Sequence, residues 1–91
     1  MYSLDHTTRF KKDLKIIIKR GYDISLLNTV VEELLKGNPL PSHNRDHALT
    51  GNWKNHRECH ITPDWLLIYR IEKDVLVLTL TRTGTHSDFS F

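Results

Sequence analysis

The chain has 91 residues, a single cysteine and a formal net charge of +2, from 13 Lys and Arg against 11 Asp and Glu. This length suits one domain with a modest core and leaves no room for a separate cofactor-binding domain. The lone Cys59 excludes an intrachain disulfide and a CxxC-type zinc site, and the small net charge permits a nucleic-acid partner without proving one.

The sequence also bears on location. The first residues, MYSLDHTTRF, lack the apolar stretch of a signal peptide, and no run approaches the roughly 18 apolar residues of a membrane span. A lone cysteine fits a reducing compartment. We therefore expect a cytoplasmic protein that does not contact a membrane.

The first half of the chain predicts a short strand over residues 2–6 and then two helices. After the strand, apolar residues recur at helical spacing: Phe10, Leu14, Ile17 and Ile18. Gly21 is expected to end this helix, and Asp23 to begin a second one. The second helix has an apolar stripe made of Ile24, Leu27, Val30, Val31, Leu34 and Leu35, and Gly37 follows it. Because the connection is short, the two helices should form a hairpin.

The second half predicts antiparallel strands. Residues 53–61, 65–71 and 75–81 are rich in β-branched and aromatic side chains, and turn-forming residues separate them at 62–64 and 72–74. The predicted class is α+β, with two layers: the N-terminal strand and helical hairpin packed on one face of a mainly antiparallel sheet.

Strand alternation assigns side chains to the two faces of this sheet. Cys59 and Ile61 share one face, and Glu58 and His60 share the other. If the helices cover the first face, Glu58 and His60 point into solvent or a groove. In the last strand, three residues should face the helices: Leu76, Leu78 and Leu80. Arg82 is expected past the end of that strand.

Titratable residues concentrate in this half, where five of the six histidines lie between positions 43 and 86. Histidine exchanges a proton near neutral pH, so several beside carboxylates and a guanidinium suit acid–base chemistry on an anion. The candidate site consists of His47, Glu58, His60, Asp64, Arg82 and His86. For His6, His43 and His56 the simpler interpretation is a surface or structural role, and for Cys59, Trp53 and Trp65 it is packing.

A metal site is the less favoured interpretation. His56, His60 and Asp64 are spaced four apart, but on a strand such residues lie about 13 Å from one another, too far for one ion. We therefore expect no metal and no cofactor.

Three motifs occur in a fixed order: DHxLxGxW, RECHxxPDWLLIY and RTGTH. In this order and spacing the chain resembles the YafQ branch of the RelE/ParE toxin superfamily, over nearly its whole length. The resemblance implies a single RelE-like domain over residues 1–91. It implies a ribosome-dependent, metal-independent endoribonuclease that cleaves mRNA in the A site. It also implies a DinJ-like antitoxin, with operator DNA bound only through the antitoxin complex.

The resemblance also implies roles for individual residues. Those at acid–base positions are His47, His60, Asp64 and His86, with Glu58 where some relatives use a carboxylate. Those expected to contact RNA are Arg82, Lys54, Phe89 and Phe91. Relatives tend to end in HSDLF, whereas Ser90 stands at the aromatic position here. We expect Phe91 to take the aromatic role and Phe89 to pack inward.

Two alternatives remain open. Arg82 could be a structural ion-pair partner of Glu58 rather than a phosphate contact. The whole chain could be a ParE-type toxin that poisons DNA gyrase by binding, although binding alone would not call for clustered titratable groups.

Overall fold

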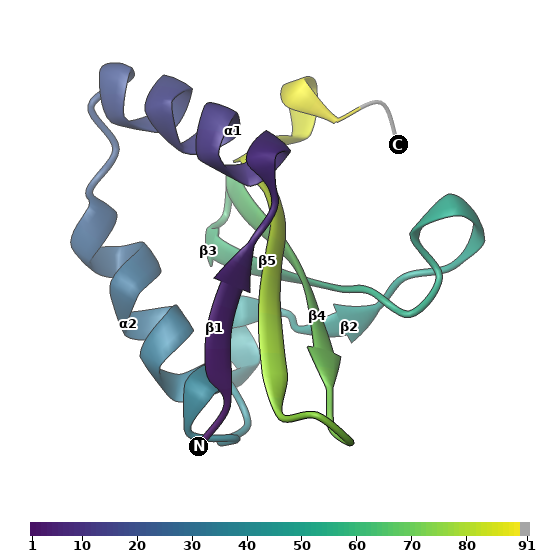
Figure 1. Ribbon diagram of the computed structural model, residues 1–91. Coiled ribbons are helices and arrows are strands. Elements are labelled where there is room, and N and C mark those ends of the chain that lie inside the picture. Colours follow the sequence, from purple (N-terminus) through teal and green to yellow (C-terminus); the bar gives the residue numbers. More distant parts are fainter. Residues whose placement is uncertain (90–91) are drawn as a thin grey trace.

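The computed structural model describes residues 1–89; Ser90 and Phe91 lie outside the described part. Its helices and strands are β1 (Ser3–His6), α1 (Thr8–Lys19), α2 (Ile24–Leu35), β2 (His47–Ala48), β3 (Arg57–Thr62), β4 (Trp65–Glu72) and β5 (Val77–Thr85). Short 3-10 turns occupy η1 (Ser42–Asn44), η2 (Gly51–Trp53) and η3 (His86–Asp88). The strands form one sheet in the order β1-β5-β4-β3-β2 (Figure 1).

Local signals place both helices as predicted. Thr7 caps α1 by accepting a hydrogen bond from the Phe10 amide, and Asp23 caps α2 by accepting one from the Ser25 amide. Gly21 follows α1 with a φ of 83°, a left-handed conformation that costs glycine little. The expected ends of the helical hairpin are therefore confirmed.

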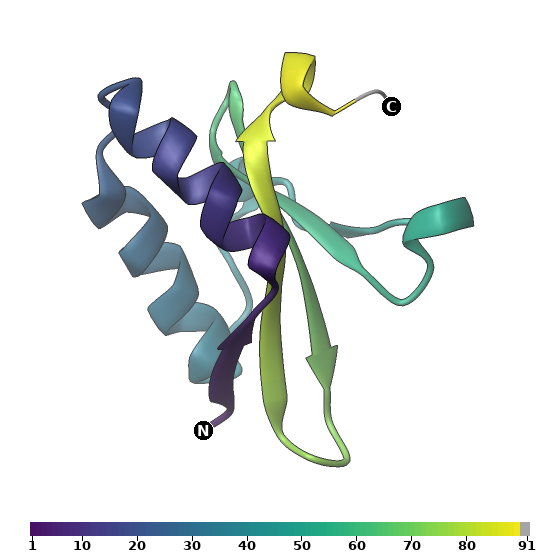
Figure 2. The same ribbon diagram turned by 45° about the horizontal axis from the view of Figure 1, so that its top comes forward.

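Both helices cover the same face of the sheet (Figures 1 and 2). The core between the layers combines apolar residues of α1, α2 and three strands: Phe10, Ile17, Leu27, Val30, Val31, Leu34, Cys59, Ile61, Trp65, Leu67, Tyr69, Leu78 and Leu80. Trp65 is completely buried, and its indole N–H donates to Thr83 Oγ1 at 2.8 Å. The packing roles expected for Trp65 and Cys59 are thus confirmed, whereas Ile18 of the predicted stripe is half exposed.

The strand boundaries differ from the prediction in two places. β3 begins only at Arg57, because Trp53 belongs to the η2 turn and Asn55 has a positive φ. β5 runs from Val77 to Thr85, so Arg82 lies inside the strand and not past its end. Leu76 does not face the helices: it is exposed in the β4–β5 turn, with a φ of 55°.

The longer β5 has a physical cause in its neighbours. On one side β1 pairs with it in parallel, Ser3 opposite Val77 and His6 opposite Leu80. On the other side β4 continues the antiparallel ladder until Trp65 meets Thr85. Local sequence could not reveal this pairing. The sheet is otherwise antiparallel, so the predicted class and layers are confirmed.

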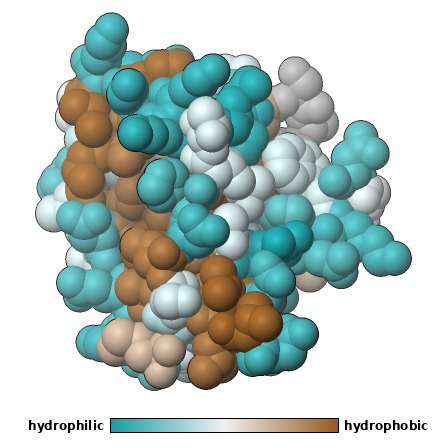
Figure 3. Space-filling view, viewed as in Figure 1, coloured by the Kyte–Doolittle hydropathy of each residue, from teal (hydrophilic) through white to brown (hydrophobic). Residues whose placement is uncertain are grey.

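Apolar side chains also reach the surface, as Figure 3 shows on one face. The large exposed ones are Met1, Leu4, Ile16, Ile18, Leu26, Val75 and Leu76. No helix within residues 1–89 has the length and apolar character needed to cross a membrane.

Candidate active site

Two of the predicted site histidines lie near one carboxylate, and a third lies beside one of them. Glu58 is buried, and its Oε1 lies 3.5 Å from His47 Nε2 and 4.0 Å from His60 Nε2. The rings of His60 and His86 have centroids 5.7 Å apart. His47, Glu58, His60 and His86 therefore form a connected cluster, hereafter the histidine cluster.

Sheet register explains why residues so far apart in sequence meet. His47 lies opposite Glu58 across the β2–β3 pair. His60 lies opposite Leu66, which in turn lies opposite Gly84 near the end of β5. The chain then turns at η3, and His86 is exposed at its first position. The expectation that Glu58 and His60 share the face opposite Cys59 is confirmed.

The segment that carries His47 is held by Asp46. Its carboxylate accepts hydrogen bonds from Arg57 Nη2 at 3.2 Å and from the Tyr69 hydroxyl. Burial and this carboxylate both raise the pKa of Tyr69, so its hydroxyl stays protonated and donates. His47 Nδ1 lies 2.7 Å from the Arg45 carbonyl, which orients the ring and leaves Nε2 toward Glu58. Arg57 thus anchors the segment that carries β2 through Asp46.

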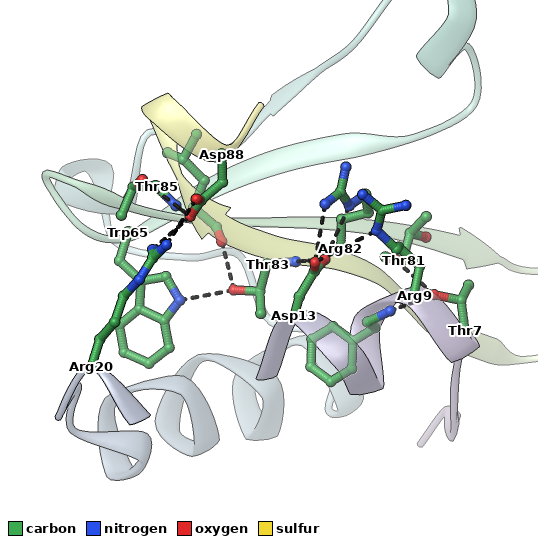
Figure 4. Close-up of polar contacts among 12 residues, drawn as sticks. Thr7, Arg9, Asp13, Arg20, Trp65, Thr81, Arg82, Thr83, Thr85 and Asp88 are labelled. Carbon is green, nitrogen blue, oxygen red and sulfur yellow. Dashed lines mark hydrogen bonds and ion pairs between the residues drawn. The ribbon is translucent and has the colours of Figure 1, made fainter. Parts of the chain in front are cut away.

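Arg82 forms an ion pair with Asp13 and not with Glu58. Its Nε and Nη2 each donate to Asp13 of α1 at 3.0 Å, and the Thr83 amide donates to the same carboxylate (Figure 4). The alternative in which Arg82 pairs with Glu58 is therefore wrong, because Arg82 of β5 pairs with Asp13 of α1. The guanidinium also lies 4.8 Å from the centroid of the Phe89 ring, which is buried as expected.

Three predicted site residues remain: Asp64, Lys54 and Phe91. Asp64, in the β3–β4 turn, accepts a hydrogen bond from the Tyr22 hydroxyl at 3.4 Å. Within residues 1–89 no hydrogen bond joins it to a histidine, so its predicted role on an imidazole stays a prediction. Lys54 is exposed after η2. Phe91 falls outside the described residues.

Two residues beside His60, His43 and Arg45, were given no site role from the sequence. A hollow of about 250 Å³ is lined by His43, Arg45, His60 and Pro63. Arg45 is exposed and has a φ of 48°. In the sequence, only its position two residues before His47 indicated that Arg45 could lie near the site. The fold brings both Arg45 and His43 beside His60.

Among residues 1–89 no group of three or more His, Cys, Asp or Glu side chains is placed to hold an ion. His56 packs its ring against Trp53. Burial raises the pKa of the Cys59 thiol to about 12, so it remains protonated and inert at neutral pH.

Comparison with known proteins identifies the family. The model of a family described as the bacterial toxin of type II toxin–antitoxin system, YafQ, matches residues 2–90. The chain belongs to the YafQ family of toxins. It is 36% identical over 85 residues to the mRNA interferase toxin YafQ of Escherichia coli K12, an alignment that covers 92% of this chain and 90% of that protein.

Solved structures of YafQ-like toxins share the fold over the full length. A metal-bound toxin from Helicobacter pylori is 44% identical, with a TM-score of 0.91 and coverage of 98% of this chain and 99% of the other. YafQ in the E. coli DinJ–YafQ complex is 34% identical, with a TM-score of 0.90 and complete coverage of both chains. The resemblance found in the sequence motifs and the RelE-like fold it implied are confirmed.

Proposed function

We propose that this YafQ-family toxin is a ribosome-dependent, metal-independent endoribonuclease that cleaves mRNA and so inhibits translation in the cytoplasm. Residues 1–91 would form its single domain. The observation that carries the proposal is the pair His60 and His86, with ring centroids 5.7 Å apart and one ring beside the buried Glu58. Curated relatives are named mRNA interferases, which agrees with the predicted enzyme class.

The proposed reaction needs one base and one acid. A base removes the proton from the 2′-hydroxyl, the 2′-oxygen attacks phosphorus, the bond to the 5′-oxygen breaks, and an acid protonates that oxygen. Each catalytic nitrogen must lie within about 2.6–3.2 Å of its oxygen. Two rings 5.7 Å apart can therefore serve the attacking and leaving oxygens of one phosphate. The products are a 2′,3′-cyclic phosphate and a 5′-hydroxyl.

The other cluster residues support this pair. The buried Glu58 carboxylate lies 3.5 Å from His47 Nε2 and 4.0 Å from His60 Nε2, so it helps to orient both rings. Arg45 and the remaining N–H groups of Arg82 can contribute positive charge for the phosphorane. Asp64 as an imidazole partner, and Lys54 and Phe91 as RNA contacts, complete the proposal. Phe89 is buried beside the Arg82 guanidinium and would support the site by packing.

The proposed partners are the ribosomal A site, mRNA and a DinJ-like antitoxin, with operator DNA bound only through the antitoxin complex. The E. coli relative is seen in complex with DinJ. On this chain, exposed lysines and exposed apolar residues lie together on α1: Lys11, Lys12, Lys15, Ile16, Ile18 and Lys19. Such a surface suits an acidic, amphipathic segment.

Inducible expression in a bacterium tests the function. We expect growth arrest within minutes and new mRNA ends at a fixed position within codons, bearing 5′-hydroxyl groups. Intact mRNA together with broken chromosomes would instead support the gyrase-binding alternative.

Co-expression tests the antitoxin. A small gene adjacent to this one should restore growth, and its product should co-purify with the toxin. If no neighbouring product binds, the partner proposal fails even if mRNA cleavage is observed.

A further inference from the structure

The η3 turn that carries His86 is held by the carboxylate of Asp88. Asp88 Oδ2 accepts hydrogen bonds from the Thr85 amide at 2.8 Å and from the Thr85 hydroxyl at 3.1 Å. The Asp88 amide in turn donates to the Thr85 side chain, which completes a capping box, and the Phe89 amide donates separately to the His86 carbonyl. The direction in which the His86 side chain leaves the sheet therefore depends on Asp88.

Asp88 is in turn tied to the first helix. Arg20, the C-cap residue of α1, donates from Nη1 at 2.8 Å and from Nη2 at 3.1 Å to the two carboxylate oxygens (Figure 4). A two-point guanidinium–carboxylate contact fixes orientation as well as distance. The turn bearing His86 is thus connected to a rigid helix end 68 residues away in sequence.

Gly84 leaves the space that this arrangement needs. A Cβ atom at position 84 would lie 2.8 Å from Asp88 Oδ2 and 3.1 Å from Asp88 Cβ. Any other residue there would push the carboxylate away from Thr85 and Arg20. Gly84, Asp88 and Arg20 therefore act as one unit around His86.

We propose that Arg20 and Asp88 are positioning residues that hold His86 in its reactive orientation beside His60. The proposal rests on the proposed function, in which His86 is catalytic. Both side chains are partly exposed, 42% for Arg20 and 29% for Asp88, so their pair adds little to global stability. Loss of the pair should affect the reaction far more than it affects folding.

Single-turnover cleavage of ribosome-bound mRNA by the purified toxin tests this. Arg20→Ala and Asp88→Ala should each lower the rate at saturating ribosomes by roughly 10–10²-fold, with an unchanged half-saturating concentration and a nearly unchanged Tm. Arg20→Lys, which keeps the charge but not the two-point contact, should recover part of the rate. Lys36→Ala is the matched control, because Lys36 is the equivalent C-cap cation of α2.

The same substitutions in a His86→Ala background separate the possible outcomes. If Arg20 acts through His86, Arg20→Ala should cause no further loss once the imidazole is gone. An equal loss in both backgrounds, or a change confined to ribosome affinity, would overturn the positioning role. If His86→Ala lowers the cleavage rate but Arg20→Ala keeps the wild-type rate, the positioning role is also overturned. If His86→Ala itself keeps the wild-type rate, the proposed catalytic function is refuted.

Discussion

Arg82 and Asp13 face each other across the two layers of the fold, joined by two hydrogen bonds of 3.0 Å. The Asp13 side chain is 8% exposed and the Arg82 side chain 17%. Arg82, which the family resemblance assigns to the RNA, is therefore also the link between α1 and β5. The link aligns β5, which ends at Thr85, directly before His86.

Asp13→Ala should lower the free energy of unfolding by roughly 3–5 kcal/mol, because it leaves a largely buried guanidinium and the Thr83 amide without their acceptor. Urea denaturation measures the effect. Asp74→Ala, an exposed carboxylate in the β4–β5 turn, is the control and should change stability by less than about 0.5 kcal/mol. Similar stabilities for the two variants would show that the Asp13–Arg82 pair is not structural.

His86→Ala should relieve growth arrest while leaving the fold intact, because His86 is exposed and its ring contributes one acid or base. The cleavage rate should fall by roughly 10²–10⁴-fold. His6→Ala, a comparably exposed histidine on β1, should remain fully toxic. Equal toxicity of the His86 variant at equal expression and matching circular dichroism would remove His86 from the mechanism.

The two C-terminal phenylalanines should differ in kind. Phe89 is 6% exposed, so Phe89→Ala should lower the free energy of unfolding by about 3–5 kcal/mol. Phe91→Ala should instead weaken mRNA cleavage, by the loss of a stacking contact of roughly 1–3 kcal/mol, with little change in Tm. Thermal unfolding and mRNA-end mapping on both variants measure these effects. A lowered Tm for Phe91→Ala with weakened cleavage for Phe89→Ala would show that the two roles are exchanged.

Metal should not be required. Metal analysis of the purified toxin should find less than one equivalent of zinc, copper, manganese or nickel. Treatment with a chelator should leave the fold unchanged. Added Cu²⁺ or Zn²⁺ should inhibit cleavage rather than activate it, because an ion on His60 and His86 would occupy the lone pairs needed for proton transfer. Activation by a stoichiometric ion would contradict this, and the metal-bound relative from H. pylori makes the measurement worthwhile.

Acid should weaken the η3 turn within a defined range. The Arg20 hydrogen bond, aided by the Thr85 amide, lowers the pKa of Asp88 from 3.8 to about 2. Because the pKa of Asp88 is lower in the folded state than in the unfolded state, its ionised carboxylate stabilises the fold at any pH above the unfolded-state pKa. This contribution is lost as the pH falls through the folded-state pKa. Because the pair is partly exposed, Asp88→Asn should be only slightly less stable than the wild type at neutral pH, and this small difference should vanish between about pH 4 and 2. Urea denaturation across pH would show a constant difference if Asp88 were unpaired.

Sequence alone determined the elements whose signals are local. Helical spacing, the Asp23 cap and Gly21 located α1 and α2, since these features act within a few residues. Strand alternation placed Glu58 and His60 on one face and Cys59 on the other for the same reason. The ordered motifs were specific enough to indicate the family before any contact was known.

Tertiary structure decided what depends on distant partners. The end of β5, and with it the place of Arg82, follows from pairing with β1 and β4. The choice of Asp13 over Glu58 as the partner of Arg82 follows from where α1 crosses the sheet, and no sequence period encodes that crossing. The 5.7 Å approach of His60 and His86, and the Arg20–Asp88 contact behind it, likewise exist only because strands and a helix from opposite ends of the chain pack together.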